Sequence, residues 1–262
     1  MDKSTLGGIA IALSGIGIGL VLDGGKLAQV LQPTAALIVI GGTIGAVMVQ
    51  FPLRTVFQAI VQLKNIFLNA EPESDELVQN LLQYAYKARR EGLLSLDAEL
   101  DKIKDPFLKE SLMLAVDGVP SDDLRKMMEL QLDYQGEKND RVAKVFESAG
   151  GFAPTIGIIG AVLGLIQVMQ KLQDINEVGK GIAVAFVATI YGVASANLFF
   201  LPAAGKLKIR MRERQVIQEM TLEAVLSIME GINPRALELQ LGSYLPAPVA
   251  KREVATKVAV MQ

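Results

Sequence analysis

Two long apolar runs without any charged residue lie close together in the second half of the chain. The first extends from Gly150 to Gln170 and the second from Gly181 to Ala204. Each run is long enough to cross a bilayer, which takes about 20 helical residues. A helix of this length in a water-soluble core would carry a charged face toward water. The two runs therefore predict a transmembrane hairpin, with the polar residues 171–180 as its turn.

Two further apolar blocks, Ser4 to Leu22 and Pro33 to Phe51, precede this hairpin. Their glycines recur at three- and four-residue spacing, which lets membrane helices approach each other closely. The 21% of residues that are charged lie mainly between and after the four blocks. This distribution predicts an all-α integral membrane protein with four transmembrane helices and a cytoplasmic helical domain.

The charged portion has helical signals of its own. Ser74 begins a stretch with acidic residues in its first turn, Gly92 ends it, and Asn233 followed by proline indicates another helix start. A long amphipathic helix is expected to continue into the third span. We therefore predict transmembrane helices 1 and 2 in residues 1–52, a cytoplasmic helical domain in 53–149, transmembrane helices 3 and 4 in 150–205, a cytoplasmic helical extension in 206–242 and a flexible tail in 243–262.

The orientation follows from the cations after the fourth span. Five Lys or Arg residues lie between Lys206 and Arg214, and such clusters mark the cytoplasmic end of a span. With four spans, both termini and the large polar portion are then expected on the cytoplasmic side of the membrane.

The composition excludes several kinds of chemistry. The chain has no Cys and no His, which removes the thiolate and imidazole metal ligands and the usual neutral-pH proton shuttle. No nucleophile pair and no phosphate-binding loop is present. We therefore expect no enzymatic activity, no catalytic or metal site, no cofactor and no nucleic-acid partner.

The apolar blocks also contain no carboxylate, and Tyr191 is their only titratable side chain. A membrane path for protons or cations usually includes a carboxylate, although burying one costs about 2.5 to 3.5 kcal/mol on insertion scales. Either this chain conducts no ion, or a partner chain supplies the acid.

Three motifs, supported by residues 230–235, resemble one family of membrane proteins. They are residues 88–97 (ARREGLLSLD), residues 154–165 (PTIGIIGAVLGL) and residues 185–192 (AFVATIYG), the last followed by Pro202. Together they resemble the MotA/PomA family of flagellar motor stator subunits. The related ExbB and TolQ energisers have three spans with the large loop after the first. An ExbB/TolQ-like energiser, or another transporter or channel subunit, is the alternative.

The resemblance implies a proton-driven channel complex that converts ion flow into torque. Family members form a pentamer around two copies of MotB, whose single span carries the essential aspartate, and they act on the rotor protein FliG. They lie among the lipids of the inner membrane.

The resemblance also implies roles for particular residues. Thr155 and Thr189 match the ion path, and sodium-type members have threonine where this chain has Ala161 and Ala188. Methyl groups cannot ligate dehydrated sodium, so the expected ion is H⁺ rather than Na⁺.

Two more sets of residues follow from the same comparison of motifs. Pro154 and Pro202 match hinges, since proline removes a helix hydrogen bond and permits a kink. Arg89, or Arg90 if the register differs by one, and Asp97 match the charged positions that face the rotor. A solvated helix face is the alternative for these charges.

Overall fold

The computed structural model describes residues 3–68 and 74–244. Within these ranges the protein is all-α and contains no strand, as the sequence predicts. The chain divides into two units, residues 1–70 with 138–210 and residues 71–137 with 211–262. Most of the predicted tail lies outside the described residues, because the description ends at Tyr244.

Four helical stretches among the described residues are long and apolar enough to cross a membrane. The first is Ser4–Leu22, within α1 (Lys3–Leu22), and the second is Pro33–Gln50. The other two belong to the long helical stretches Ser121–Gln170 and Ile175–Met229. These stretches confirm the four predicted spans.

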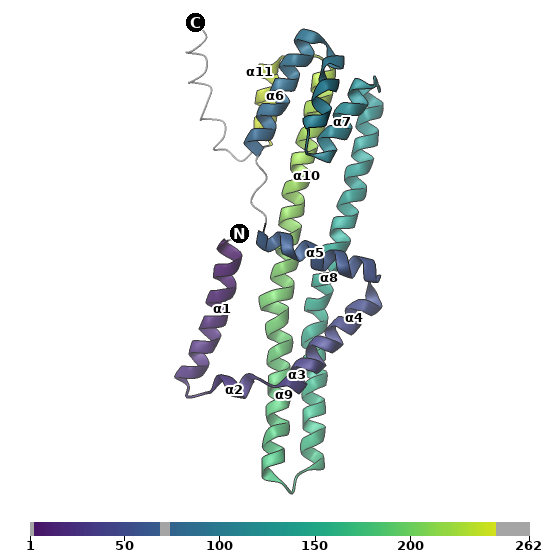
Figure 1. Ribbon diagram of the computed structural model, residues 1–262. Helices are drawn as coiled ribbons and strands as arrows, with labels where there is room; N and C mark the ends of the chain where they lie inside the picture. The colour runs from purple at the N-terminus through teal and green to yellow at the C-terminus, as the bar shows by residue number, and fades with distance from the viewer. Residues whose placement is uncertain (1–2, 69–73, 245–262) are drawn as a thin grey trace. The chain divides into compact units, whose positions relative to one another are not determined.

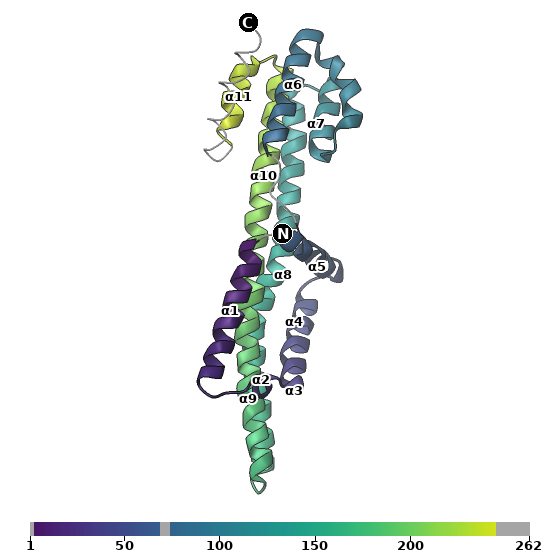
Figure 2. The same cartoon turned by 60° about the vertical axis from the view of Figure 1, so that its left-hand side comes forward.

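The predicted hairpin is formed by α8 (Ser121–Gln170) and α9 (Ile175–Ser195), which lie side by side in both views (Figures 1 and 2). The side chain of Asp174 caps α9 by accepting hydrogen bonds from the backbone N–H groups of Asn176 and Glu177. Such a cap satisfies donors that have no partner within the helix. The turn between the two spans is therefore short and defined by its own polar residues.

The fourth span does not end with α9. It continues through a π-helical turn, η3 (Ala196–Phe200), into α10 (Leu201–Met229). The second span is divided similarly into α3 (Pro33–Ala36), the π-helical η1 (Leu37–Gly41) and α4 (Gly42–Gln50). Figure 2 shows these pieces following one another as one helical path.

Two more helices complete the first unit. The short α2 (Leu27–Val30) follows α1, and the amphipathic α5 (Leu53–Leu68) follows α4. In Figure 1, α5 runs across the direction of α8 rather than along it. Its Phe57, Ile60 and Val61 side chains are exposed.

The second unit is a helical bundle with its own apolar core. It contains α6 (Ser74–Glu91), the 3₁₀ helix η2 (Leu93–Lys102), α7 (Pro106–Val116), α11 (Pro234–Gly242) and parts of α8 and α10. Its largest fully buried side chains are Leu81, Leu96, Leu112, Leu124, Met128, Met220, Leu226, Leu237 and Leu241. All of these core residues belong to the second unit itself.

Local signals in the sequence set the ends of these helices. Gly92 and Gly231 follow α6 and α10 with φ values of 86° and 72°, where a side chain would be strained. Asn233 caps α11 by accepting a hydrogen bond from the Arg235 N–H, with Pro234 in the first turn. The predicted helix stops and the predicted Asn233 start are therefore present.

The contacts within the chain divide it at different positions from the predicted domain boundaries. Residues 138–149 group with the spans, although the sequence places them in the cytoplasmic portion. Val142, Ala143 and Phe146 are buried there, and Glu147 forms an ion pair with Lys208 at 2.8 Å. Helix packing continues beyond the charge-free runs. The units defined by residue contacts therefore need not end where the predicted membrane spans end.

Candidate functional site

The two hairpin helices meet along rows of very small residues, which we call the hairpin interface. Its row on α8 consists of the buried residues Ala153, Gly157, Gly160, Gly164 and Val168, and its row on α9 and η3 consists of the buried residues Gly181, Ala185, Ala188, Gly192 and Ala196. Both rows have the three- and four-residue spacing that keeps side chains on one helix face.

The glycines in this interface let the two backbones touch. A Cβ atom added to Gly157 would lie 2.9 Å from the carbonyl oxygen of Ala188, and one added to Gly164 would lie 2.8 Å from that of Gly181. No side chain can move aside to relieve such contacts, because the neighbouring atoms belong to the backbone. Close backbone packing of this kind drives helix association in membranes.

The second span packs against both helices of the hairpin. Ala35 and Val39 form a buried cluster with Val187 and Ala188 of α9. Further along the second span, a Cβ atom added to Gly42 would lie 2.8 Å from Cγ2 of Ile156 in α8. The hairpin is therefore held on one side by the second span, which fixes the positions of Ala188 and its neighbours.

Tyr191 ties the hairpin to the segment that precedes the second span. Its hydroxyl donates a hydrogen bond to the carbonyl oxygen of Val30 at 2.6 Å and accepts one from the N–H of Gln32 at 3.2 Å. These bonds satisfy backbone groups in the break between α2 and α3. Tyr191 had no predicted role, although a lone tyrosine in an apolar run indicates a hydrogen-bond partner.

The two predicted ion-path threonines occupy different environments. Thr189 is half-buried beside the hairpin interface, and its Oγ1 donates to the carbonyl oxygen of Ala185 at 3.2 Å. Thr155 lies on an exposed face of α8, and its Oγ1 donates to the carbonyl oxygen of Phe152 at 2.8 Å. Each hydroxyl uses its hydrogen locally and keeps lone pairs that can accept from another group.

The two predicted ion-path alanines also differ. Ala188 is fully buried in the hairpin interface, where a Cβ atom added to Gly160 would lie 2.8 Å from its methyl group. Ala161 is only half-buried, on α8. Within one chain the four residues thus share a region of the hairpin but form no enclosed site, and their role in an ion path stays a prediction.

Both predicted hinge prolines interrupt helical hydrogen bonding. Pro154 lies inside α8, and Pro202 follows the π-helical η3. Just before Pro202, the N–H of Leu201 bonds to the carbonyl oxygen of Ala196, five residues back. Such π turns often mark functional segments, and whether either proline acts as a hinge stays a prediction.

The charged residues predicted to face a rotor lie around one turn of the second unit. Arg89 and Arg90 end α6, Asp97 lies in η2, and all three are exposed. Arg90 contacts the neighbouring Glu91 at 3.1 Å, whereas Arg89 and Asp97 form no ion pair with any described residue. Exposed ion pairs contribute only about 0 to 1 kcal/mol, so these charges add little to stability, and their contact with a rotor stays a prediction.

The backbone around this turn is held by an ionic cluster that sequence reasoning missed. Glu99 of η2 accepts hydrogen bonds from Lys87 of α6 at 2.6 Å and from Lys102 at 2.9 Å. These two ammonium groups, Lys87 first, lower the pKa of Glu99 from 4.5 to about 2. The cluster links the two elements that carry Arg89 and Asp97.

We predict that Glu99→Gln destabilises the protein at neutral pH and much less in acid. Because the folded pKa of Glu99 lies below the ordinary value of 4.5, its ion pairs stabilise the fold above about pH 4.5. That contribution is lost as the pH falls from 4.5 toward 2. The thermal unfolding midpoints of the wild type and Glu99→Gln should therefore differ less at pH 3 than at pH 7. Glu238→Gln, which alters an exposed carboxylate, is the control, and an equal effect of both variants would contradict the prediction.

These features define a polytopic helical membrane protein with a glycine-packed hairpin and a separate helical unit that presents exposed charges. Comparisons with known proteins agree with this class. The model of the MotA/TolQ/ExbB proton channel family matches residues 99–220, and the motility protein A N-terminal model matches residues 6–92.

Individual relatives cover almost the whole chain. Motility protein A of Bacillus subtilis strain 168 is 36% identical over 248 residues, 94% of this chain and 92% of that protein. Chemotaxis protein PomA of Vibrio alginolyticus is 30% identical over 245 residues, 94% and 96% of the two chains. A chain in the structure of C. jejuni MotAB superposes with a TM-score of 0.90 at 33% identity, covering 95% of this chain and 97% of that one. The chain therefore belongs to the motility protein A family.

Proposed function

We propose that this chain is the MotA-type stator subunit of a bacterial flagellar motor. With a MotB-type partner it forms a channel complex in which proton flow produces torque. The observation that carries the proposal is the hairpin, which is packed through glycines but has no carboxylate between Gly150 and Gln170 or between Gly181 and Ala204. An ion path through it needs an acid from elsewhere, and a single-span partner with an intramembrane aspartate supplies one.

The surface of the spans supports assembly with other chains. Large apolar side chains such as Ile158, Val162 and Phe186 are exposed on the hairpin helices, and they face either lipid or neighbouring subunits. We propose a homopentamer around a MotB dimer in the inner membrane. The cations after the fourth span support a cytoplasmic location for both termini. In this assembly the chain moves ions and transmits force, and it catalyses no chemical reaction.

The expected coupling ion is the proton, because Ala161 and Ala188 offer methyl groups where sodium would need oxygen ligands. In a strain that lacks its own stator genes, this chain and its cognate partner should restore swimming. An uncoupler that collapses the proton gradient should then stop rotation even when a sodium gradient remains. Rotation that persists on the sodium gradient alone would contradict proton coupling, and no swimming in any condition would contradict the proposed function.

The second unit is proposed to contact the rotor protein FliG through Arg89, Arg90 and Asp97. Charges on such a surface guide the approach of the partner and fix its alignment more than they increase the affinity of the contact. Arg89→Glu should therefore impair swimming while leaving the thermal midpoint unchanged, and a charge reversal on the rotor should restore part of it. Lys126→Glu, at another exposed cation of the same unit, is the control. If Arg89→Glu cells swim as well as the wild type, these charges do not contact the rotor and only form a solvent-exposed helix face.

A further inference from the structure

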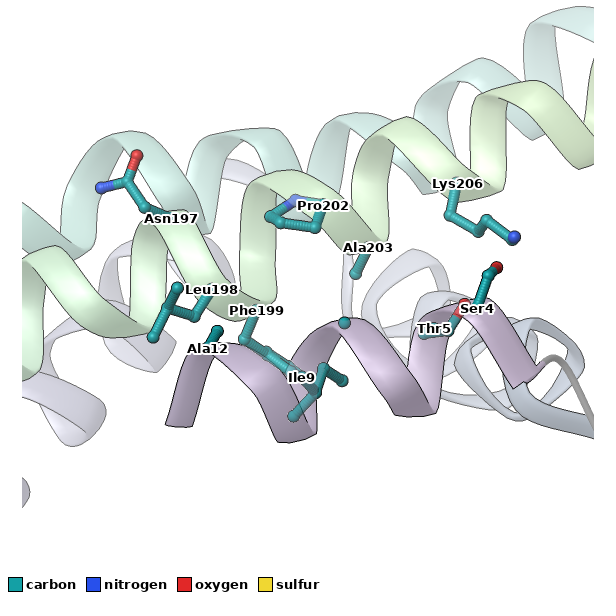
Figure 3. A pocket seen from close by; sticks show the side chains of 11 residues that line it. Ser4, Thr5, Ile9, Ala12, Asn197, Leu198, Phe199, Pro202, Ala203 and Lys206 are labelled. Atoms are coloured by element: carbon teal, nitrogen blue, oxygen red, sulfur yellow. The ribbon is translucent and has the colours of Figure 1, made fainter. Parts of the chain in front are cut away.

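A groove of about 380 Å³ lies in the first unit, between α1 and the segment that joins η3 to α10 (Figure 3). Ser4, Thr5 and Lys206 lie together at one end of it, and each already interacts with another group. Asn197 also lines the groove, and its amide donates to the carbonyl oxygen of Val193 at 2.9 Å. The polar side chains of this groove are therefore engaged within the chain, and we assign it no ligand.

The second unit, by contrast, exposes a row of large apolar side chains on α8, which we call the α8 face. It consists of Met127, Leu130 and Tyr134, which are 51%, 71% and 65% exposed. Their spacing of three and four residues puts them on one side of the helix. Arg125 lies on the opposite side of α8, where it pairs with Glu223 of α10. The α8 face therefore points away from α10.

A second exposed apolar side chain, Leu239, lies on α11. It is 81% exposed, whereas Leu237 and Leu241 on the other side of this helix belong to the buried core. Gln240 accepts a hydrogen bond from the hydroxyl of Ser227 in α10 at 3.2 Å. The core contacts and this bond fix the rotation of α11 about its axis, so Leu239 points away from the unit.

Each of these apolar sites has an unpaired charge beside it. Asp133 lies one turn after Leu130 on α8, and Arg235 lies one turn before Leu239 on α11. Both charged side chains are exposed, and neither forms an ion pair with a described residue. Leu239 and Arg235, which we call the α11 face, are therefore complementary in charge to Leu130 and Asp133. Opposite charges of this kind fix the register of a contact between proteins.

The two faces lie on different sides of the second unit. In both views α10 lies between α11 and the part of α8 that belongs to this unit (Figures 1 and 2). The α8 face points away from α10, so it does not cover the α11 face of its own chain. Two different faces per subunit are what a head-to-tail contact needs, and such contacts close into rings of identical subunits.

We propose that the α8 face of one copy of this chain packs against the α11 face of the next copy in the ring. Leu130 and Tyr134 then cover Leu239 of the neighbouring copy, and Asp133 pairs with its Arg235. The occupant is a second copy because the complementary surfaces belong to the same chain. This inference rests on the homopentamer of the proposed function. The faces are small compared with a stable interface, so this contact adds to association through the spans.

The contact can be tested by disulfide cross-linking. Because the chain contains no Cys, every disulfide comes from an introduced cysteine. Leu130→Cys and Leu239→Cys are combined in one chain, which is expressed with a cysteine-free cognate partner and oxidised in isolated membranes. The two single variants are controls. The pair Leu94→Cys with Leu239→Cys is the matched control, because Leu94 is a 74% exposed leucine of the same unit outside both faces.

The double variant should give a ladder from dimers to closed rings, and the controls should remain monomeric. Asp133→Arg alone and Arg235→Asp alone should each lower the yield of dimer about two- to fivefold, which is the contribution of one exposed ion pair. The two substitutions together should restore the yield, because the charges are then exchanged. All of these positions are exposed, so the thermal midpoint should stay at the wild-type value.

Three outcomes would overturn this contact. They are a monomer only from the double variant, equal cross-linking of the matched control, and a dimer from Leu130→Cys alone, which would mean that two α8 faces meet. The ladder is read in membranes and needs no motor function. Swimming of cells with the wild-type chain therefore tests the proposed function separately, and cells that swim without forming the ladder would overturn only the contact.

Discussion

Gly192→Val is expected to disrupt the hairpin and to abolish swimming. A Cβ atom at this position would lie 2.5 Å from the carbonyl oxygen of Ala153, 3.1 Å from Cα of Gly157 and 3.2 Å from Cα of Pro154. All three neighbours are backbone atoms, so no change of side-chain rotamer makes room. Overpacking usually costs about 1–3 kcal/mol and sometimes more. Valine adds two methyl groups beyond Cβ, so we expect the upper end of this range.

The measurement is the midpoint temperature of thermal unfolding of the full chain in detergent. It is obtained by size-exclusion chromatography of samples heated to different temperatures. Gly179→Val is the matched control, because Gly179 is an exposed residue of the same helix with no atom within 4 Å of an added Cβ. The control should keep the wild-type midpoint and Gly192→Val should lose several degrees or fail to accumulate. Equal midpoints for the two variants would mean that α8 and α9 do not touch at this position.

The spans and the helix ends could be predicted from the sequence because both depend on local chemistry. A span is recognised from the transfer of about 20 apolar residues into lipid, which depends on the residues of that segment alone. The span Ser4–Leu22 can therefore be identified without knowledge of the segments that pack against it. Gly92, Gly231 and Asn233 act on the turn in which they lie. No distant residue changes these preferences.

Contacts between distant segments could not be predicted in the same way. The small residues of the hairpin can be read from the sequence. Which of them face each other depends on how each helix is rotated about its axis, and the sequence of one helix does not determine this rotation. The bond from Tyr191 to Val30 joins residues 161 positions apart. Only the packed structure shows that this hydroxyl closes the break before the second span.

The irregular turns were also missed. The sequence predicted a continuous second span, whereas Leu37–Gly41 and Ala196–Phe200 are π-helical and Leu93–Lys102 is 3₁₀-helical. The two π-helical segments have the same apolar content as a regular helix, so hydropathy cannot distinguish them. Leu93–Lys102 carries Asp97 of the proposed rotor contact, and Ala196–Phe200 lies just before Pro202.

Thr189→Val is expected to stop ion-driven rotation while leaving the fold almost unchanged. Valine has the shape of threonine and the same branching at Cβ, so packing beside the hairpin interface is retained. The lost bond from Oγ1 to the Ala185 carbonyl is 3.2 Å long, and one neutral bond contributes only about 0.5–1.5 kcal/mol. The thermal midpoint should therefore fall only slightly.

The expected effect on ion passage is much larger. If the hydroxyl oxygen of Thr189 accepts from a hydrated proton or its carrier water, its removal forfeits a hydrogen bond to a charged group, about 1.5–3 kcal/mol. This corresponds to a 10- to 150-fold slower passage, by the relation of about 1.4 kcal/mol per tenfold. Rotation speed of tethered cells, with the chain and its partner expressed in a strain without stators, measures this loss.

Two further variants separate a role in the ion path from a general need for hydroxyl groups. Thr189→Ser keeps the oxygen and should restore rotation. Ser195→Ala removes a hydroxyl from the same helix, where Oγ donates to the carbonyl oxygen of Gly192 at 3.1 Å, and it should rotate normally. Normal rotation of Thr189→Val would remove this residue from the ion path. A loss in Ser195→Ala as large as in Thr189→Val would assign both hydroxyls to helix packing instead, because the two share local bonding but only Thr189 matches the predicted path.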